Sequence, residues 1–475
     1  MDWSEYSSYD ALAQAELVAT RQVTPLELLE AAIERIERHN PLLNAVVYKA
    51  FDEARRVASG PLPDGPFQGV PFLVKDLGQR VAGWPRTSAS FFAEIKADPD
   101  DSELVRRYRA AGLVLAGKTN TPEFGIPGVT QSERLGACRN PWNPDHISGG
   151  SSGGAAAAVA SGMVAVAHAS DGLGSIRIPA ACCGLVGMKP TRDRNPNGGE
   201  DSDRAIGFSV DHVVSRTVRD SAAMLDATGF PEPASPYAYP KKDRPFLEEV
   251  SRSPGRLKIF WSGDAPSGRP ISDEMAAAIQ RTAERLTQLG HDVREKPISL
   301  DWRLFYRAQA VVSGSNFAAG MTRMVQAIGR EPEHDIGPLA RRGYDRGREL
   351  TGQQAMWGWQ QLRLMSRQIL ATFEECDVYL SPVLGTEPPR VDWLDPISLS
   401  IRDYDKRSAA TFPFTPAFNI TGQPSLSLPL WQSEGGLPLA MMFTGRYGDE
   451  GTLYRLAGQL EKECPWKDRR PLVWN

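Results

Sequence analysis

The 475-residue sequence predicts an α/β fold in which helices pack on a mostly parallel or mixed β-sheet. The prediction depends on neighbouring segments that join helical periodicity to a short apolar strand. In three places the helix comes first, at 101–112 with 113–117, at 155–161 with 164–169 and at 353–375 with 378–382. In a fourth place a strand at 257–260 comes before a helix at 274–289.

The first clear helix is expected to begin after Thr24, which can cap it. Pro25 suits the first helical position, and Glu27 completes a capping box with Thr24. Apolar residues then recur at helical spacing until Asn40-Pro41, where we expect the helix to end.

Length alone leaves open whether the chain forms one large domain or two. Polar or proline-rich stretches occur at 192–205, 229–256 and 384–397, and each is interpreted as a surface connection. None of them is long or biased enough to require a domain boundary.

The charge balance argues against a nucleic acid or a membrane surface as partner. The chain has 54 Lys+Arg against 58 Asp+Glu, so no excess of positive charge is present. The N-terminus lacks the basic and apolar regions of a signal peptide, and the most apolar window, 155–169, is too short to span a membrane. We therefore expect a cytoplasmic protein that acts on a small neutral or mixed molecule.

The cysteines and histidines predict neither a disulfide framework nor a metal centre. Five cysteines form an odd set without a CxxC pair, and six histidines are scattered among them. Buried free thiols are the expected state of Cys138, Cys182, Cys183, Cys376 and Cys464, and no metal is expected.

Two Gly/Ser clusters within 149–187 lie on either side of a small-residue helix and a strand. Glycine lets the backbone approach a ligand closely, so the clusters predict the floor of a binding site. A tightly packed helix and strand with glycine turns is the alternative, and the spacing alone leaves both open.

Two catalytic patterns match here and are set aside. Residues 149–153 fit the G-x-S-x-G nucleophile elbow, which needs a strand directly before it, whereas 139–148 contains two prolines and is not predicted to be one. Residues 112–119 fit the P-loop pattern, but an apolar strand occupies the place of the phosphate-binding loop.

A lysine is the best candidate for a catalytic base. A buried lysine with a lowered pKa can take the proton of a serine hydroxyl. Lys75 ends the apolar run 70–74, which would bury its side chain. The alternative is a solvated lysine that pairs with Asp76.

Six blocks, taken in order, resemble the signature of the amidase signature family, from about residue 10 to the end of the chain. They are GVPFLVKDL at 69–77, GKTNTPEF at 117–124, RNPW at 139–142, GGSSGGAAAAVASG at 149–162, SDGLGSIRIPAACCGLVGMKPT at 170–191 and FNITGQPSLSLP at 418–429. The opening residues and the last block are most similar to a bacterial subgroup that contains 6-aminohexanoate cyclic dimer hydrolase.

This resemblance implies one domain, 1–475, with a large mixed β-sheet covered by helices on both faces. Its signature core would span about 65–195, and the region from about 300 to 415 would shape the substrate pocket. Aromatic residues that are candidates for this pocket, most of them expected to be core, are Trp302, Phe305, Tyr306, Trp357, Trp359, Phe412 and Phe414.

The resemblance also implies the catalytic residues. Lys75 would be the base, Ser151 the relay after a cis peptide bond from Gly150, and Ser175 the nucleophile. Backbone N–H groups of the turn would bind the oxyanion, at Gly172, Leu173, Gly174 and Ser175. Leu173 departs from the family, which often has glycine there, and this change is expected to reshape the acyl pocket.

Three neighbouring residues are interpreted as structural. Asp171 and Arg177 are expected to form an internal ion pair that supports the turn, and His168 is expected to be a core residue.

The implied reaction is hydrolysis of an amide carbon–nitrogen bond through an acyl-enzyme, without metal or cofactor. Linear and cyclic amides, anilides, carbamates and oligoamides all stay open as substrates. Two alternatives also stay open, the glutamine-hydrolysing subunit of a tRNA-dependent amidotransferase and a catalytically silent binding protein. The expected partner is a small-molecule amide, and the sequence leaves the oligomeric state open, with a homodimer as one outcome.

Overall fold

The computed structural model describes residues 3–93, 95–196, 204–232, 235, 238–239 and 241–474. Its centre is an 11-stranded sheet with the strand order β1-β3-β2-β8-β10-β9-β14-β15-β13-β11-β12. Strands pair in parallel from β3 through β2 to β8 and from β13 through β11 to β12, and antiparallel elsewhere. The predicted large mixed sheet is therefore confirmed.

The strands of this sheet are β1 (Val46–Lys49), β2 (Pro71–Lys75), β3 (Val114–Thr119), β8 (Val166–Asp171), β9 (Val186–Lys189), β10 (Val210–Ser215), β11 (Lys258–Trp261), β12 (Asp292–Glu295), β13 (Val378–Pro382), β14 (Ser425–Gln432) and β15 (Pro438–Gly445). Four short strands form two separate hairpins, β4 (Gln131–Ser132) with β5 (Gly136–Ala137), and β6 (Arg139–Asn140) with β7 (Asn143–Ile147).

The helices of the first half are α1 (Trp3–Tyr6), α2 (Ala11–Ala19), α3 (Pro25–Leu43), α4 (Phe51–Ala58), α5 (Glu103–Ala110), η1 (Glu123–Gly125), α6 (Gly153–Ala160), α7 (Arg177–Cys183) and α8 (Val218–Thr228). Those of the second half are α9 (Phe246–Val250), α10 (Asp273–Gln288), α11 (Trp302–Ile328), α12 (Pro338–Glu349), α13 (Gly352–Glu375), α14 (Ile401–Thr411), α15 (Pro416–Thr421) and α16 (Glu450–Glu463).

Helices cover both faces of the sheet, and β2 shows why. Side chains alternate between the two faces of a strand. Phe72 and Val74 pack into the cluster formed with α5 and α8, whereas Leu73 packs into the cluster formed with α6. Lys75, two residues after Leu73, is thereby directed to the face that carries α6.

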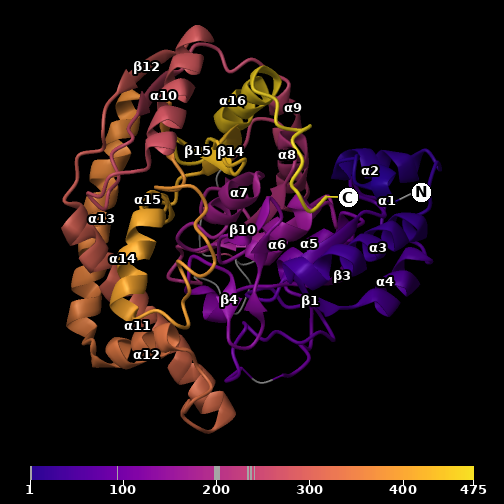
Figure 1. Ribbon diagram of the computed structural model, residues 1–475, viewed down its shortest axis with the longest axis horizontal. Coiled ribbons are helices and arrows are strands. Elements are labelled where there is room, and N and C mark those ends of the chain that lie inside the picture. Colours follow the sequence, from indigo (N-terminus) through magenta and orange to yellow (C-terminus); the bar gives the residue numbers. More distant parts are fainter. Residues whose placement is uncertain are drawn as a thin grey trace.

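The long helices α11 and α13 lie on the opposite side of the molecule from the N-terminal helices α1 to α4 (Figure 1). The C-terminal residues return to the N-terminal side, where the carbonyl oxygen of Trp474 accepts a hydrogen bond from Arg35 at 2.8 Å. The candidate site lies between these two regions, at the ends of β2 and β8.

Two local predictions were wrong. Helix α3 does not end at Asn40-Pro41 but continues to Leu43, with the left-handed residue Asn44 closing it. Pro41 lies inside α3 and lacks the N–H for one helical hydrogen bond, yet the helix continues for two residues beyond it. The Asn40 side chain also accepts from the backbone N–H groups of Ala45 and Val46, which fixes the exit of the chain.

The segment before residue 149 does contain a strand, β7, which pairs with β6 outside the main sheet. β7 pairs with β6 at Asn143 and Ile147 and bonds to the segment 389–391 at Asp145 and Ile147, so Pro144, which takes part in neither pairing, can be accommodated. The predicted connection at 229–256 contains the short helix α9. Of the connection at 192–205, residues 197–203 lie outside the described residues.

Other expectations are confirmed. The capping box of Thr24 and Glu27 is formed, and β13 spans the predicted residues 378–382. All five cysteines are buried free thiols. Within the described part of the chain, no helix has the length and apolar character needed to cross a membrane. The single-domain organisation stays a prediction.

Candidate active site

Lys75 ends β2 on the face covered by α6, and its side chain is fully buried. Its amine contacts three hydroxyl groups, with Nζ to Oγ distances of 2.7 Å to Ser151, 2.9 Å to Ser152 and 3.0 Å to Ser170. These serines come from two places in the sequence, the segment that leads into α6 and strand β8. The fold therefore brings the predicted base and relay into direct contact.

The hydrogen bonds of Ser152 distinguish its hydroxyl from that of Ser151. Ser152 donates to the carbonyl oxygen of Ser170 at 3.2 Å, so its own proton is already used. It can only accept from Lys75. Ser151 retains the freedom to donate its proton to the amine, at the shortest of the three distances.

Burial lowers the pKa of Lys75 well below its ordinary value, because the charged form loses its hydration. The carboxylate of Asp171 opposes this shift, and the guanidinium of Arg204 adds to it. Asp76 is not a partner of Lys75, since it accepts from Thr87 and pairs with Lys118 at 3.8 Å. The alternative of a solvated lysine paired with Asp76 is therefore wrong.

Ser151 follows a cis peptide bond from Gly150, as the resemblance implied, and is almost fully buried. The backbone around it is tightly packed, because a Cβ at Gly150 would lie 2.7 Å from the backbone of Gly128 and Val129. Only glycine fits this position. The tight packing fixes Ser151 opposite the lysine amine.

Ser175 lies in the turn between β8 and α7, and its side chain is half-buried. The turn wraps around the carboxylate of Asp171, which accepts from the backbone N–H groups of Gly174 at 2.6 Å and Ile176 at 3.2 Å. Among the described residues no hydrogen bond involves the Ser175 hydroxyl. The link from Ser151 to Ser175 thus stays a prediction.

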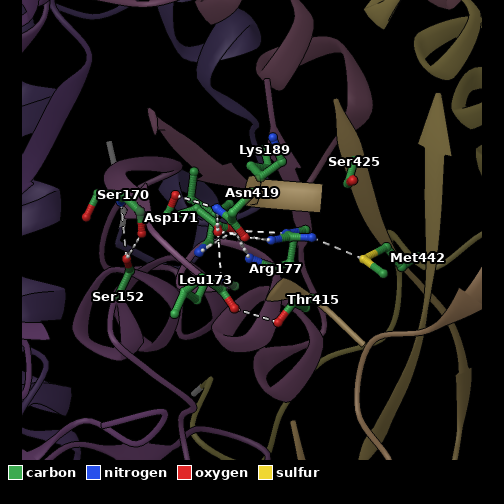
Figure 2. A network of polar contacts seen from close by, with 12 residues as sticks. Ser152, Ser170, Asp171, Leu173, Arg177, Lys189, Thr415, Asn419, Ser425 and Met442 are labelled. Atoms are coloured by element: carbon green, nitrogen blue, oxygen red, sulfur yellow. Dashed lines mark hydrogen bonds and ion pairs between the residues drawn. The ribbon is translucent and has the colours of Figure 1, made fainter. Parts of the chain in front are cut away.

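Asp171 and Arg177 form the expected ion pair, at 2.9 Å between Nε and Oδ2, and both side chains are fully buried. Asn419 completes the network, donating to Asp171 Oδ1 at 2.8 Å and accepting from Arg177 at 2.6 Å (Figure 2). Burial alone would raise the pKa of Asp171, but Arg177 and Asn419 overcome it and hold this pKa below its usual range. The turn is therefore supported by a permanent charge pair.

The predicted oxyanion donors differ in availability. The N–H of Gly174 points to Asp171, which leaves Gly172, Leu173 and Ser175 as backbone donors to a substrate. The carbonyl oxygen of Leu173 accepts from the hydroxyl of Thr415 at 2.6 Å, which ties the turn to the start of α15 (Figure 2). Gly174 has a φ of +131°, and a Cβ there would overlap the Thr415 side chain.

His168 is a core residue, as expected, but it also holds Lys75 in place. Its Nδ1 accepts from the backbone N–H of Lys75 at 3.2 Å, and its Nε2 lies 2.9 Å from Asp211 Oδ1. These partners assign the proton to Nε2. Burial lowers the pKa of His168 well below its ordinary value, with a further lowering from nearby Lys75. His168 is therefore neutral and positions the end of β2.

No group of three or more His, Cys, Asp or Glu residues is arranged for a metal ion within the described ranges. Independence from metal and cofactor stays a prediction.

Sequence reasoning missed Ser152, Ser170, Thr415 and Asn419. Three of them lie inside the blocks that carry the family resemblance, Ser152 in the Gly/Ser cluster, Ser170 before Asp171 and Asn419 in the last block. Their residue types alone gave no sign of a contact, because the partners of Asn419 lie 242 and 248 residues away in the chain.

Comparison with known proteins agrees with this geometry. The family model described as Amidase matches residues 27–454, most of the chain. The chain belongs to the amidase family. This amidase is 37% identical to the 6-aminohexanoate-cyclic-dimer hydrolase of Paenarthrobacter ureafaciens, over 98% of this chain and 97% of that protein.

Comparison with solved structures also finds amidases. The amidase superposes on 6-aminohexanoate cyclic dimer hydrolase with a TM-score of 0.92 at 35% identity, covering 99% of both chains. It superposes on a bacterial aryl acylamidase of the amidase signature family with a TM-score of 0.86 at 28% identity, covering 98% of this chain and 99% of the other. The fold and the enzyme class inferred from the sequence blocks are confirmed.

Proposed function

We propose that this amidase cleaves the carbon–nitrogen bond of a small or oligomeric amide through an acyl-enzyme on Ser175, with Ser151 as relay and Lys75 as base. The observation that carries the proposal is the 2.7 Å contact between the buried amine of Lys75 and the hydroxyl of Ser151. A lysine with a lowered pKa and three hydroxyl neighbours is suited to accept a proton from a serine hydroxyl.

In the acylation step, neutral Lys75 takes the proton of Ser151 while Ser151 takes the proton of Ser175. The Ser175 oxygen attacks the amide carbonyl carbon, and the carbonyl oxygen becomes the oxyanion. The relay then runs in reverse. Lys75 returns a proton through Ser151 to the leaving nitrogen, the carbon–nitrogen bond breaks, and the amine departs.

In the deacylation step, water attacks the ester on Ser175, and the relay takes one proton from that water. The carbon–oxygen bond to Ser175 breaks, Ser175 regains its proton, and a carboxylic acid leaves. The backbone N–H groups of Gly172, Leu173 and Ser175 are the proposed oxyanion donors in both steps. The fixed charge pair of Asp171 and Arg177 supports the loop that carries them.

The proposed substrates are linear or cyclic amides, anilides and carbamates. Support comes from the names of similar proteins, a hydrolase of the 6-aminohexanoate cyclic dimer and an aryl acylamidase. The region 300–415 contributes residues near the site. Phe412 packs close to Gly128, beside Ser151, and Thr415 contacts the nucleophile turn.

We further propose that the enzyme works in the cytoplasm on small molecules and without nucleic acid. A homodimer is the proposed assembly, which light scattering on the purified chain would test. A monomer at all working concentrations would contradict it.

The proposed reaction is tested by a substrate screen in buffer that contains EDTA. The panel holds 6-aminohexanoate cyclic dimer, its linear dimer, an acyl anilide, a carbamate and a primary amide. Wild type is compared with Ser175→Ala and with Ser132→Ala, a buried serine in β4 that serves as the matched control. We expect Ser175→Ala to fold normally and to lose both turnover and labelling by a fluorophosphonate.

Mass spectrometry of a trapped acyl-enzyme locates the nucleophile independently. The acyl group is expected on Ser175. Its appearance on Ser151 or Ser152 would assign the nucleophile elsewhere, and full activity in Ser175→Ala would reject the mechanism.

A further inference from the structure

A cavity of about 280 Å³ opens where α13 passes α15, away from the contacts of Lys75 described above. Trp359, Arg363 and Arg367 of α13 line it, spaced four residues apart and hence on one stripe of the helix. Arg192, from the segment after β9, and Phe208, from the segment before β10, reach the same cavity.

The floor of the cavity is aromatic. The rings of Phe208 and Trp359 stack with their centroids 5.7 Å apart and an interplanar angle of 26°. Leu362 and Ile420 extend this apolar surface. Phe208 is buried, whereas Trp359 is partly exposed along the wall of the cavity. An apolar group entering here would contact the exposed part of Trp359 beside Leu362 and Ile420.

The rim of the cavity is positively charged. Arg363 lies over the Trp359 ring at 5.2 Å, and Arg192 lies over the Phe208 ring at 5.9 Å. The described residues that line the cavity include three arginines and neither Asp nor Glu. Arg363 and Arg367 take part in no ion pair between described residues. In a chain of net charge −4, this is a local concentration of positive charge.

We propose that this cavity binds a small organic carboxylate, with its apolar body against the exposed part of Trp359 and its carboxylate between the guanidinium groups. Guanidinium groups bind carboxylates through paired N–H donors, and aromatic faces hold these groups flat and partly desolvated. The combination favours an aromatic or branched aliphatic acid over an inorganic anion, which would leave the apolar lining uncovered.

The cavity is connected to the nucleophile turn by hydrogen bonds. Arg192 donates to the backbone carbonyl oxygens of Asn419 and Ile420 at 2.8 and 2.9 Å. The side chain of Asn419 in turn contacts Asp171 beneath the turn. A carboxylic acid is also the product that amide hydrolysis releases, but the binding site does not depend on that reaction, because its test measures binding alone.

The test is calorimetric titration of the purified full chain with benzoate and with benzyl alcohol, a neutral aromatic of similar size that has no amide bond to cleave. The same titrations are made with an Arg363→Gln/Arg367→Gln variant. The matched control is Arg323→Gln/Arg346→Gln, which removes the same charge from exposed positions on α11 and α12. Both double variants carry substitutions at exposed positions. Circular dichroism checks that every variant folds.

We expect benzoate to bind at one site, at least tenfold more tightly than benzyl alcohol. The Arg363→Gln/Arg367→Gln variant should lose at least tenfold in benzoate affinity, and the control should keep the affinity of wild type. Trp359→Leu should also weaken benzoate binding. Equal affinity for benzyl alcohol, or wild-type affinity for benzoate in either the double variant or Trp359→Leu, would overturn the proposal. Benzoate bound only at the catalytic serine would give the same affinity in all these variants.

Discussion

The amine of Lys75 lies 2.7 Å from the hydroxyl of Ser151, and both groups are almost completely removed from solvent. Burial shifts the amine toward its neutral form, and the contact gives that form a proton to accept. The other two hydroxyl contacts, from Ser152 and Ser170, hold the amine in one position. Base strength and geometry therefore come from the same feature, a lysine side chain enclosed by serines.

Lys75→Ala should lower kcat by about 10²–10⁴-fold, the usual size of a general base contribution. Substrate affinity should change much less, because the amine acts in proton transfer and does not bind substrate. Lys75→Arg should not restore turnover, since a guanidinium keeps its proton throughout this pH range. Steady-state kinetics give kcat and KM for each variant. Near-normal turnover in Lys75→Arg would show that Lys75 is a structural cation.

The rate should rise with pH on the acid side of the profile. Below the pKa of Lys75 the amine is an ammonium group that cannot accept a proton, so the rate should fall about tenfold for each pH unit. Because burial lowers this pKa well below its ordinary value, the limb should lie at a lower pH than it would for a solvent-exposed lysine. Asp171 should add no limb there, since its pKa is held low by Arg177.

The pH profile is best measured in two ways. One is kcat/KM for an anilide, and the other is the rate of labelling by a fluorophosphonate, which reports activation of the nucleophile without an amide substrate. If kcat/KM and the labelling rate rise over the same pH range, the assignment of Lys75 as the base is supported. A flat labelling rate from pH 5 to pH 9 would place the base elsewhere.

Asn419→Ala should lower the free energy of unfolding by about 2–3 kcal/mol, since it leaves buried polar groups of Asp171 and Arg177 without a partner. Turnover should fall as well, because the turn that carries Ser175 depends on this network. Urea unfolding measures the stability change. Gln353→Ala, at an exposed position in the first turn of α13, is the control. A loss below about 0.5 kcal/mol would mean that the ion pair does not need Asn419.

Local patterns predicted the elements well because they depend on residues close in sequence. The capping box at Thr24, the strand at 378–382 and the burial of Lys75 all follow from neighbouring residues. The end of α3 was predicted too early because a proline was taken to end the helix, whereas Pro41 lies inside it. Strand β7 was missed because an edge strand tolerates a proline that a central strand would not.

The site itself was predicted by ordered sequence blocks and not by residue chemistry. Lys75 and Ser151 are 76 residues apart, and nothing local indicates that their side chains meet. The same limit hid Asn419, which reaches Asp171 across 248 residues. The sheet order that brings β14 beside β9 also depends on pairing between segments far apart in the chain. Long-range contacts of this kind set the site, and only the structure displays them.

Leu173→Gly should change substrate preference more than it changes catalytic power. Leu173 is half-buried in the nucleophile turn, and its backbone does not have the positive φ that would require glycine. Removing its side chain should widen the space beside Ser175, while the backbone N–H donor and the contact of its carbonyl with Thr415 are retained. The added flexibility should cost about 0.5–1 kcal/mol of stability.

We therefore expect kcat/KM for a bulky acyl anilide to rise about tenfold relative to a small primary amide, equivalent to about 1.4 kcal/mol of relieved crowding in the transition state. Fluorophosphonate labelling with a short-chain probe should stay within about threefold of wild type, because proton relay and oxyanion donors are unchanged. Leu173→Ala should give an intermediate preference. An unchanged ratio of the two substrates in both variants would show that Leu173 faces away from the acyl group.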